Sequence, residues 1–536
     1  MNAPATPDRR RWLGLVVISI AVSLIIVDST IVNVAIPSVV DDLGITSTQV
    51  QWVQESYTLV FAALLLVFGT LADRFGRRRI LLIGVALFAL SSVVAALAPT
   101  GELLILSRVV QGLGGAMILP ATLSLLNATF TGRERGIAFA VWGSTIGGMA
   151  AVGPLLGGWL TADFSWRWAF GINLPLGILI IVGALLVVQE SRAEHRRRVD
   201  VVGAVLSVLL FTSLVFGLIE GRTYGWWATA KGAPDFWTLE ISPIPFVFAL
   251  TLVTLVAFIA WGVHRERRGR PTLIAFSLFG ITSFRNGNIA ALIVSLGEFG
   301  VILALPLWLQ NVLGYDALQT GFLLLALAGG SFLASGFAGS ASGKIAPVWI
   351  VRGGLVAEII GLVVLALVIT SDTAWWPLAI GLAVYGFGVG LATAQLTGVV
   401  LAEVPVGESG QASGTQSTSR QVGSALGIAI LGTVLFTSLG AQLTDRLPEQ
   451  LPSDVRQQVV DLVVDSAGAA IPGLEATSPD AAAAARDAFS EATRAATFTA
   501  AGFLAVGLLA TLSLGGSAAG DRRSRSREDT PASSAP

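Results

Sequence analysis

The sequence of 536 residues contains no cysteine, only two histidines and few charged residues, 12% of the total. The absence of cysteine excludes disulfide bonds, thiolate metal sites and a cysteine nucleophile. Both histidines, His195 and His264, lie in arginine-rich segments, so we expect no metal site. Soluble domains carry about 25% charged residues, whereas 54% of this chain is hydrophobic. The composition therefore predicts a protein with many membrane-spanning segments.

Two further absences narrow the function. The formal net charge is -1, which gives no reason to expect nucleic-acid binding. The glycine clusters "QGLGGA" and "GFGVGLA" lie inside apolar runs, and the sequence has no G-x-x-x-x-G-K-[ST] phosphate loop and no soluble domain to hold ATP. We therefore expect neither an enzyme nor an ATP-driven pump.

Apolar runs long enough to cross a bilayer recur along the whole chain. A helical span needs about 20 mostly apolar residues. The fourteen expected spans are 12–36, 49–72, 78–98, 102–126, 136–161, 168–188, 200–220, 241–262, 282–312, 317–338, 350–370, 375–401, 413–438 and 496–517. The sequence therefore predicts an all-α polytopic membrane protein.

Basic residues gather in alternate loops, as in Arg74–Arg79 and Arg265–Arg270. Basic loops stay in the cytoplasm, so both termini are expected there. Lysine occurs only twice and alanine and glycine are abundant, which suggests a GC-rich bacterial genome and hence the bacterial cytoplasmic membrane. The acidic segment 440–495 is expected to form an external cap with amphipathic and alanine-rich helices.

Asp28 and Arg108 are charged residues inside predicted spans, where a lone charge costs roughly 2.5 to 3.5 kcal/mol. At 1.5 Å per residue Asp28 lies about 24 Å from the cytoplasmic face, and Arg108 lies about 9 Å below the outer face. The two are thus at similar depth, and we expect an ion pair or a water-bridged pair in a shared aqueous cavity. An unpaired buried carboxylate tends to take up a proton, which makes Asp28 a proton carrier.

Other polar residues of the first two spans leave two interpretations open. Asn33 shares a helix face with Ser29, and both either line a substrate cavity or are satisfied by neighbouring helices. Glu55 is either a coupling carboxylate or a surface carboxylate that reaches the headgroups. We assign Asn33 and Gln54 to the cavity and Glu55 to proton coupling.

The later spans hold four more such residues. Glu298 lies sixteen residues into its span, the same offset as that of Asp28, and we assign it to proton coupling. Arg420 lies four residues after Gln416 and either lines the cavity with it or braces a helix junction. For Glu358, placement at the membrane interface is the simpler interpretation.

Several motifs, in this order and spacing, resemble those of the major facilitator superfamily. They are "VDSTIVNVAIP" in the first span, "GTLADRFGRRRIL" (69–81), "LSRVVQGLGGA" (106–116), "AVGPLLGGWL" (151–160) and "WRWAFGINLP" (166–175). With fourteen spans, the chain is similar to the fourteen-helix branch of drug:proton antiporters. The motifs cover residues 25–175 closely, whereas the rest matches mainly by hydropathy.

The resemblance implies a major facilitator fold with two six-helix bundles and two inserted helices. The N-terminal bundle would comprise 1–190, the inserted helices 200–262, and the C-terminal bundle 280–517 with the external loop 440–495. Residues 518–536 would form a disordered cytoplasmic tail. One bundle would rock against the other to alternate access to a central cavity.

The resemblance also implies roles for particular residues. Asp28 and Arg108 carry over as proton-coupling residues, and Glu55 matches an acidic position of some members. A cytoplasmic latch would be formed by Gly69, Asp73, Arg74, Gly76, Arg77 and Arg78, and the antiporter helix motif by Gly153, Pro154, Gly157 and Gly158. The glycines let helix backbones approach closely, and the proline frees a backbone carbonyl.

The implied function is proton-coupled export of amphipathic drugs or antibiotics by a monomer, with the proton gradient as energy source, no cofactor, and only protons, membrane lipids and small substrates as partners. Members that export divalent cations carry extra carboxylates where this chain reads "LALAGGSFLASG" and "GTQSTSRQVG", so neutral or monovalent cargo is expected. The alternative is a dedicated exporter of an endogenous lipid or metabolite. An importing symporter is disfavoured by "AVGPLLGGWL".

Overall fold

A computed structural model describes residues 8–45, 47–192, 200–230, 232–234, 237–341, 344–448 and 452–514. Within these ranges the chain is helical and forms no β-strand beyond one isolated bridge between Ala228 and Ile241. Fourteen helices of the described part are long and apolar enough to cross a membrane, which confirms the expected number of spans. Prolines 120, 154 and 306 lie inside these helices, where neighbouring helices can satisfy the freed backbone groups.

The helices follow one another with short connections. They are α1 (Asp8–Leu43), α2 (Ser47–Phe75), α3 (Arg77–Ala96), α4 (Gly101–Thr129), α5 (Gly132–Asp163), α6 (Arg167–Gly171), α7 (Asn173–Val187), α8 (Val201–Tyr224), α9 (Ile244–Arg267), α10 (Thr282–Asn311), α11 (Ala317–Ala341), α12 (Pro347–Val368), α13 (Trp375–Val400), α14 (Ser409–Arg446), α15 (Ser453–Asp465), α16 (Ile471–Thr477) and α17 (Pro479–Ala510). The short α6 and α7 together make one span, which is interrupted at Ile172.

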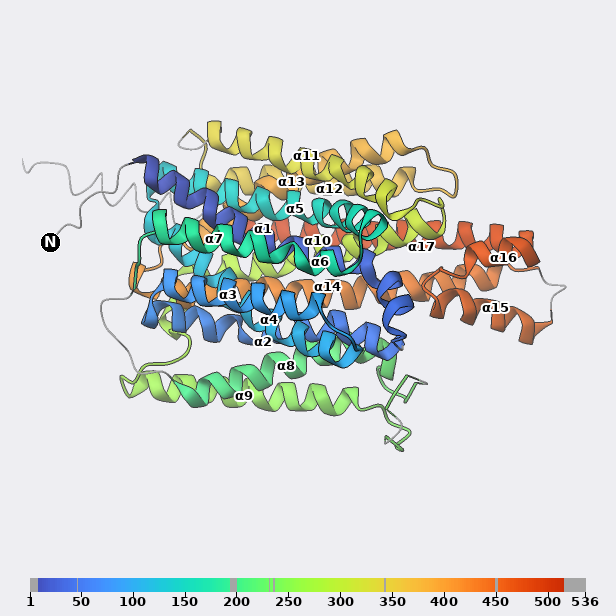
Figure 1. The fold of residues 1–536 in the computed structure, drawn as a ribbon, viewed down its shortest axis with the longest axis horizontal. Helices are drawn as coiled ribbons and strands as arrows, with labels where there is room; N and C mark the ends of the chain where they lie inside the picture. Colours follow the sequence, from blue (N-terminus) through green and yellow to red (C-terminus); the bar gives the residue numbers. More distant parts are fainter. Residues whose placement is uncertain are drawn as a thin grey trace, which may run out of the picture.

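The long helices lie side by side in two groups that repeat one packing scheme (Figure 1). In the N-terminal half, α1 packs on α5 and α7, and α4 packs on α2 and α3. In the C-terminal half, α10 packs on α14 and α17, and α13 packs on α11 and α12. The two halves meet where α2 lies on α14 and where α5 lies on α11, while α8 and α9 pair with each other at the edge beside α2.

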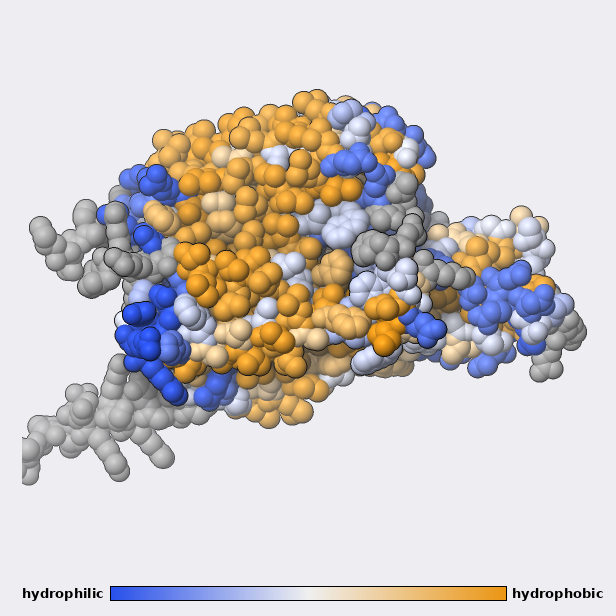
Figure 2. Space-filling view, turned by 90° about the horizontal axis from the view of Figure 1, so that it is seen from below, coloured by the Kyte–Doolittle hydropathy of each residue, from blue (hydrophilic) through white to orange (hydrophobic). Residues whose placement is uncertain are grey.

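The surface has the pattern of a membrane protein. Figure 2 shows a broad hydrophobic band between two hydrophilic ends. On the membrane-spanning helices, large apolar side chains such as Leu186, Val253 and Leu333 are exposed, where lipid would cover them. One end carries Arg74–Arg79, where α2 ends and α3 begins, and Arg265–Arg270, where α9 ends, and we call it the basic end. The opposite end carries α15 and α16, and we call it the cap end.

The cap differs in detail from the expected external loop 440–495. The preceding helix α14 continues to Arg446, and the alanine-rich segment is the first part of α17 rather than a separate helix, because α17 begins at Pro479. Only α15 and α16 are added between the two long helices, and Figure 1 shows all four projecting beyond the other helices. An ion pair between Arg446 and Glu491, with a nitrogen–oxygen distance of 2.7 Å, joins the projecting parts of α14 and α17.

Candidate functional site

Asp28 and Arg108 form a buried ion pair inside the N-terminal half. The Arg108 Nη1 atom lies 2.5 Å from Asp28 Oδ2, and both side chains are almost fully removed from solvent. The other carboxylate oxygen accepts hydrogen bonds from Asn173 Nδ2 at 2.7 Å and from Gln111 Nε2 at 3.2 Å. Ser92 accepts from the same two amides, at 3.1 and 2.6 Å. The predicted pair therefore exists, as the centre of a polar network that joins α1, α3, α4 and α7.

The surroundings of this pair correct one expectation. Asp28 does not face an aqueous cavity, because its side chain is fully buried. Three donors satisfy its carboxylate. On the other side, the Arg108 guanidinium lies 4.3 Å from the centre of the Tyr57 ring, a cation–π contact, and its Nε donates to the Val53 carbonyl at 3.1 Å. Charge compensation and hydrogen bonds together offset the desolvation of both ions.

Sequence reasoning missed Gln111 and Asn173. Gln111 lies three residues after Arg108, so the two side chains share a face of α4. Asn173 stands in "WRWAFGINLP", at the first residue of α7. Two signals could have identified them: an amide three residues after the motif arginine, and an amide at the start of a helix inside a motif.

Asp73 joins the two halves at the basic end. Its carboxylate accepts hydrogen bonds from the backbone N–H groups of Gly410 at 2.8 Å and Gln411 at 3.0 Å, in the first turn of α14. The first N–H groups of a helix have no partner within the helix and carry its positive dipole end, so an acidic side chain satisfies them well. Arg77 donates to Asp73 Oδ1 at 2.7 Å and to the Val406 carbonyl at 2.5 Å.

The glycines of the predicted latch have separate roles. A Cβ on Gly69 would lie 2.4 Å from the carbonyl oxygen of Gly410, so this glycine allows the close crossing of α2 and α14. Gly76 has a φ of 111°, and a Cβ there would meet the Glu190 carboxyl group at 2.7 Å. Glu190 accepts from the backbone N–H groups of Arg78 and Arg79 and so satisfies the start of α3.

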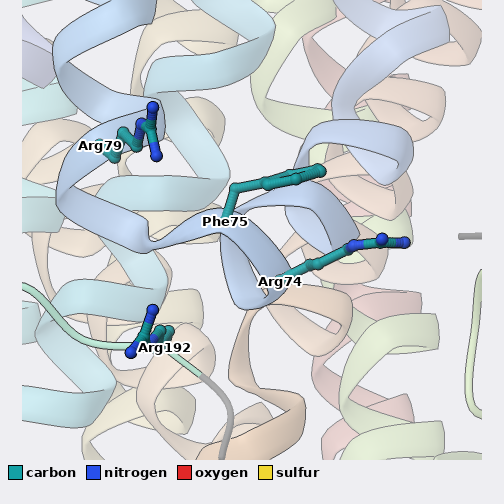
Figure 3. Close-up of a pocket in the computed structure, with 4 residues that line it drawn as sticks. All are labelled: Arg74, Phe75, Arg79 and Arg192. Carbon is teal, nitrogen blue, oxygen red and sulfur yellow. The ribbon is translucent and has the colours of Figure 1, made fainter. Parts of the chain in front are cut away.

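Two latch arginines stay in their own half. Arg78 donates to the Val188 carbonyl at 3.1 Å, and the Arg74 guanidinium lies 5.1 Å from the centre of the Phe75 ring. Figure 3 shows Arg74 and Phe75 extending away from Arg79 and Arg192, with which they line a surface pocket.

Three further contacts reinforce the closure at the basic end and were not predicted. Asn127 donates to the Ser409 hydroxyl at 2.9 Å, Arg135 to the Ala402 carbonyl at 3.3 Å, and Gln395 to the Gly136 carbonyl at 3.1 Å. All three cross between the halves. They lie outside the recognised motif, and their residue types alone gave no signal.

A second buried charge cluster lies in the C-terminal half. Arg420 Nη2 lies 3.3 Å from Glu298 Oε2, and Thr393 donates to the other carboxylate oxygen at 2.7 Å. Arg420 thus pairs with Glu298, whereas the sequence left bracing and cavity lining open. Glu358 is fully buried in the middle of α12, so the expected interfacial placement is wrong. Its helix faces α13 and α17 rather than the membrane surface at this point.

The remaining predicted residues are scattered. Glu55 is not at the lipid surface: Gln51 donates to it at 2.9 Å and to Glu220 of α8 at 3.2 Å, so it lies at the junction of α2 with an inserted helix. Gln416 is buried and donates to Thr397 at 3.1 Å. Gln54 is half-buried on α2, and the side chain of Asn33 lies outside the described part of the structure.

The glycines of the predicted antiporter helix motif let α5 pack closely on two neighbours. A Cβ on Gly153 would lie 1.8 Å from Thr30 Oγ1, and one on Gly157 would lie 2.9 Å from Ile31, both on α1. Gly158 instead lies beside Leu318 of α11, in the other half, where a Cβ would be 3.8 Å away. Pro154 stands between them inside the helix.

The profile of the Major Facilitator Superfamily matches residues 18–285 and 287–444. The chain belongs to the major facilitator superfamily. The probable actinorhodin transporter of Streptomyces coelicolor is 37% identical over 429 residues, which cover 78% of this chain and 71% of that protein. The puromycin resistance protein pur8 of Streptomyces alboniger is 34% identical over 424 residues (78% and 80%), and the multidrug resistance protein Stp of Mycobacterium tuberculosis is 32% identical over 418 residues (78% and 74%).

Solved structures of major facilitator transporters share the fold. The human organic anion transporter MFSD10 matches with a TM-score of 0.60 at 13% identity, over 94% of this chain and all of that one. A bacterial homologue of the lysosomal transporter Spinster, in an inward-facing and occupied conformation, matches with a TM-score of 0.54 at 16% identity, over 95% and 97%. This major facilitator protein is therefore a multi-pass membrane transporter and not an enzyme, and its relatives are antibiotic and multidrug transporters.

Proposed function

We propose that the protein is a proton-coupled antiporter that exports amphipathic drugs or antibiotics across the bacterial cytoplasmic membrane. The observation that carries the proposal is the buried Asp28–Arg108 pair in a transporter whose halves are held together at the basic end by Asp73 and Arg77. A titratable ion pair and a separable contact between halves are the two parts that an exchange cycle needs.

The pair supplies the proton step. Protonation of Asp28 removes its charge and with it the attraction that holds Arg108, so the guanidinium must find another partner. The Val53 carbonyl and the Tyr57 ring already lie beside it, on α2. A proton on Asp28 thereby changes the contacts between α1, α4 and α2, and α2 carries Asp73 to the other half. Proton binding and closure are thus connected through one helix.

The basic end is assigned to the cytoplasm, with both termini. Arginine-rich loops favour the cytoplasmic side, and the first and last described helices begin and end there: Arg10 donates to the Leu186 carbonyl, and Arg352 donates to the Thr511 carbonyl. On this assignment the contacts of Asp73 close the transporter toward the cytoplasm. Opening to the cytoplasm then requires those hydrogen bonds to break.

The substrates are expected to be neutral or monovalent. For a neutral drug exchanged for one proton, a membrane potential of about 100 mV and one pH unit together supply ~3.7 kcal/mol. A monocation exchanged one for one would draw on the pH term alone. Arg420, 13% exposed at its side chain, carries positive charge into the C-terminal half, which disfavours divalent cations. No cofactor is required, and the monomer contains both halves.

The alternative is a dedicated exporter of one endogenous metabolite or lipid. The relatives support both proposals, because one is a probable transporter of a single compound, actinorhodin, whereas others are multidrug resistance proteins. The two functions differ in how many classes of compound the protein would transport.

A substrate panel in inverted membrane vesicles with an acidic lumen tests both proposals. We expect several neutral or monocationic amphiphiles to accumulate in the lumen, with proton release that a protonophore abolishes. Accumulation that survives the protonophore would contradict proton coupling. Accumulation of a single compound class would favour the dedicated exporter.

A further inference from the structure

Glu358 is a buried carboxyl group that the export mechanism above leaves unused. It lies in the middle of α12, its side chain is 0% exposed, and neither carboxyl oxygen has a hydrogen-bond partner among the described residues. By contrast, Asp28, Asp73 and Glu298 each accept from two or more donors. A carboxylate without donors or an adjacent cation is not stable in such a place, because desolvation disfavours its charged form.

The fold makes room for this glutamate. A Cβ on Gly388 of α13 would lie 2.6 Å from the Cγ atom of Glu358 and 2.4 Å from its backbone nitrogen. The glycine therefore lets α13 pass directly over the glutamate side chain. Glu358 is thus buried at a close helix crossing, which only a small residue on α13 permits.

Titratable residues on the helices packed around Glu358 have partners elsewhere. Its own helix carries Arg352, whose guanidinium donates to the Thr511 carbonyl. The sequence of α13 holds one titratable residue, Tyr385, which donates to the backbone carbonyl of Glu298 at 3.3 Å. Arg494 of α17 donates to the Ile369 carbonyl, at the end of α12.

Helix α13 links Glu358 to the charge pair of Glu298 on α10 and Arg420 on α14: its Gly388 lies on Glu358, and its Thr393, five residues later, donates to Glu298. One guanidinium is thus available to two carboxyl groups, and it is paired with Glu298 at 3.3 Å. The cluster is electrically neutral when Glu358 carries a proton. When that proton leaves, two negative charges compete for Arg420.

We propose that Glu358 binds a second proton in the C-terminal half in each cycle of the antiporter, with the predicted coupling residue Glu298 as its competitor for Arg420. The proposal rests on the proton-coupled export proposed above. Release of the proton from Glu358 draws Arg420 away from Glu298. Arg420 lies ten residues after Gly410, about 15 Å along α14 from the hydrogen bonds to Asp73, so its shift acts on the helix that closes the basic end.

The enclosure of Glu358 fits this role. With no exposed surface in the arrangement closed at the basic end, it cannot exchange protons with water there. It exchanges its proton only when the halves move, which keeps proton transfer linked to the change of access.

The proton stoichiometry tests the proposal. In proteoliposomes without a membrane potential, the final gradient of a neutral substrate changes about tenfold per pH unit for each proton exchanged. We expect about 100-fold for the wild type and about tenfold for Glu358→Gln, which keeps the shape of the protonated acid. Equal gradients in both would overturn the proposal. A wild type that accumulates nothing would instead refute the export proposal.

A second measurement does not depend on transport. Infrared spectra of the purified protein should show the C=O band of a buried protonated carboxylic acid, resistant to exchange, that is lost in Glu358→Gln. The matched change Asp28→Asn should leave this band, since the Asp28 carboxyl group has Arg108 and two amides as donors, whereas Glu358 has none among the described residues. An unchanged band in Glu358→Gln would overturn the proposal. If that variant does not fold, Glu358→Met removes the same group with similar volume.

Discussion

Asp73 is predicted to hold the two halves together at the basic end. Its carboxylate accepts from two backbone N–H groups of α14 and from Arg77, which itself reaches Val406. In Asp73→Asn the side chain keeps its volume but loses its charge. The ion pair and the charge-assisted part of the hydrogen bonds between the halves are then lost, while one carbonyl acceptor remains.

The size of the effect follows from these contacts. A hydrogen bond to a charged group contributes about 1.5 to 3 kcal/mol. Two backbone N–H groups of α14 donate to Asp73 across the halves, and the amide that replaces the carboxylate retains an acceptor for one of them. We therefore expect the closed arrangement to lose ~2 kcal/mol relative to the open one, which is about a 30-fold change in their ratio.

Spin-label distances can measure this change directly, because the chain has no cysteine that would compete for the label. Labels at Arg79→Cys and Val406→Cys report on opposite halves, and both positions are exposed. In Asp73→Asn the distance distribution should gain a longer component. The matched control Arg74→Gln should not, since Arg74 lies on Phe75 of its own half. A distribution in Asp73→Asn that is unchanged from the wild type would refute the reasoning.

Two further predictions concern stability. Gly153→Ala should destabilise the protein by about 1 to 3 kcal/mol, because its Cβ would overlap Thr30, whereas Gly158→Ala has room; equal melting temperatures in detergent would contradict this. At the cap end, the hydrogen bond from Arg167 lowers the pKa of Asp42 below its usual value of 3.8. A group with a lowered pKa stabilises the folded state above its unfolded pKa and loses this contribution as the pH falls through its folded pKa. The wild type should therefore be more stable than Asp42→Asn at neutral pH, and the difference should shrink as the pH falls below about 4. A difference that grows toward low pH would contradict this.

Hydropathy was sufficient to predict the spans, because each must be apolar over the bilayer thickness. Hydropathy did not predict where α17 begins, because the alanine-rich stretch from Pro479 is helical and continues into the apolar part without a marked boundary. Counting residues along a helix gives depth, and this was enough to match Asp28 with Arg108. It does not give the direction in which a side chain points.

The direction in which side chains point also explains the other predictions that were wrong or incomplete. The approach of Arg420 to Glu298 depends on how α14 and α10 are rotated against each other, and the burial of Glu358 depends on the crossing of α13 at Gly388. Neither rotation nor crossing is encoded in a local pattern. The same holds for Glu55, which shares the Gln51 amide with Glu220 of an inserted helix whose position could not be predicted from the sequence.

The most direct test of the central claim is drug transport driven only by an imposed pH gradient in inverted vesicles that contain Asp28→Asn. The account predicts that this variant inserts into the membrane but loses gradient-driven accumulation. The matched variant Asp42→Asn, which changes an exposed aspartate of the same helix, should retain it. Undiminished accumulation in Asp28→Asn would contradict the assignment of the buried pair to proton coupling.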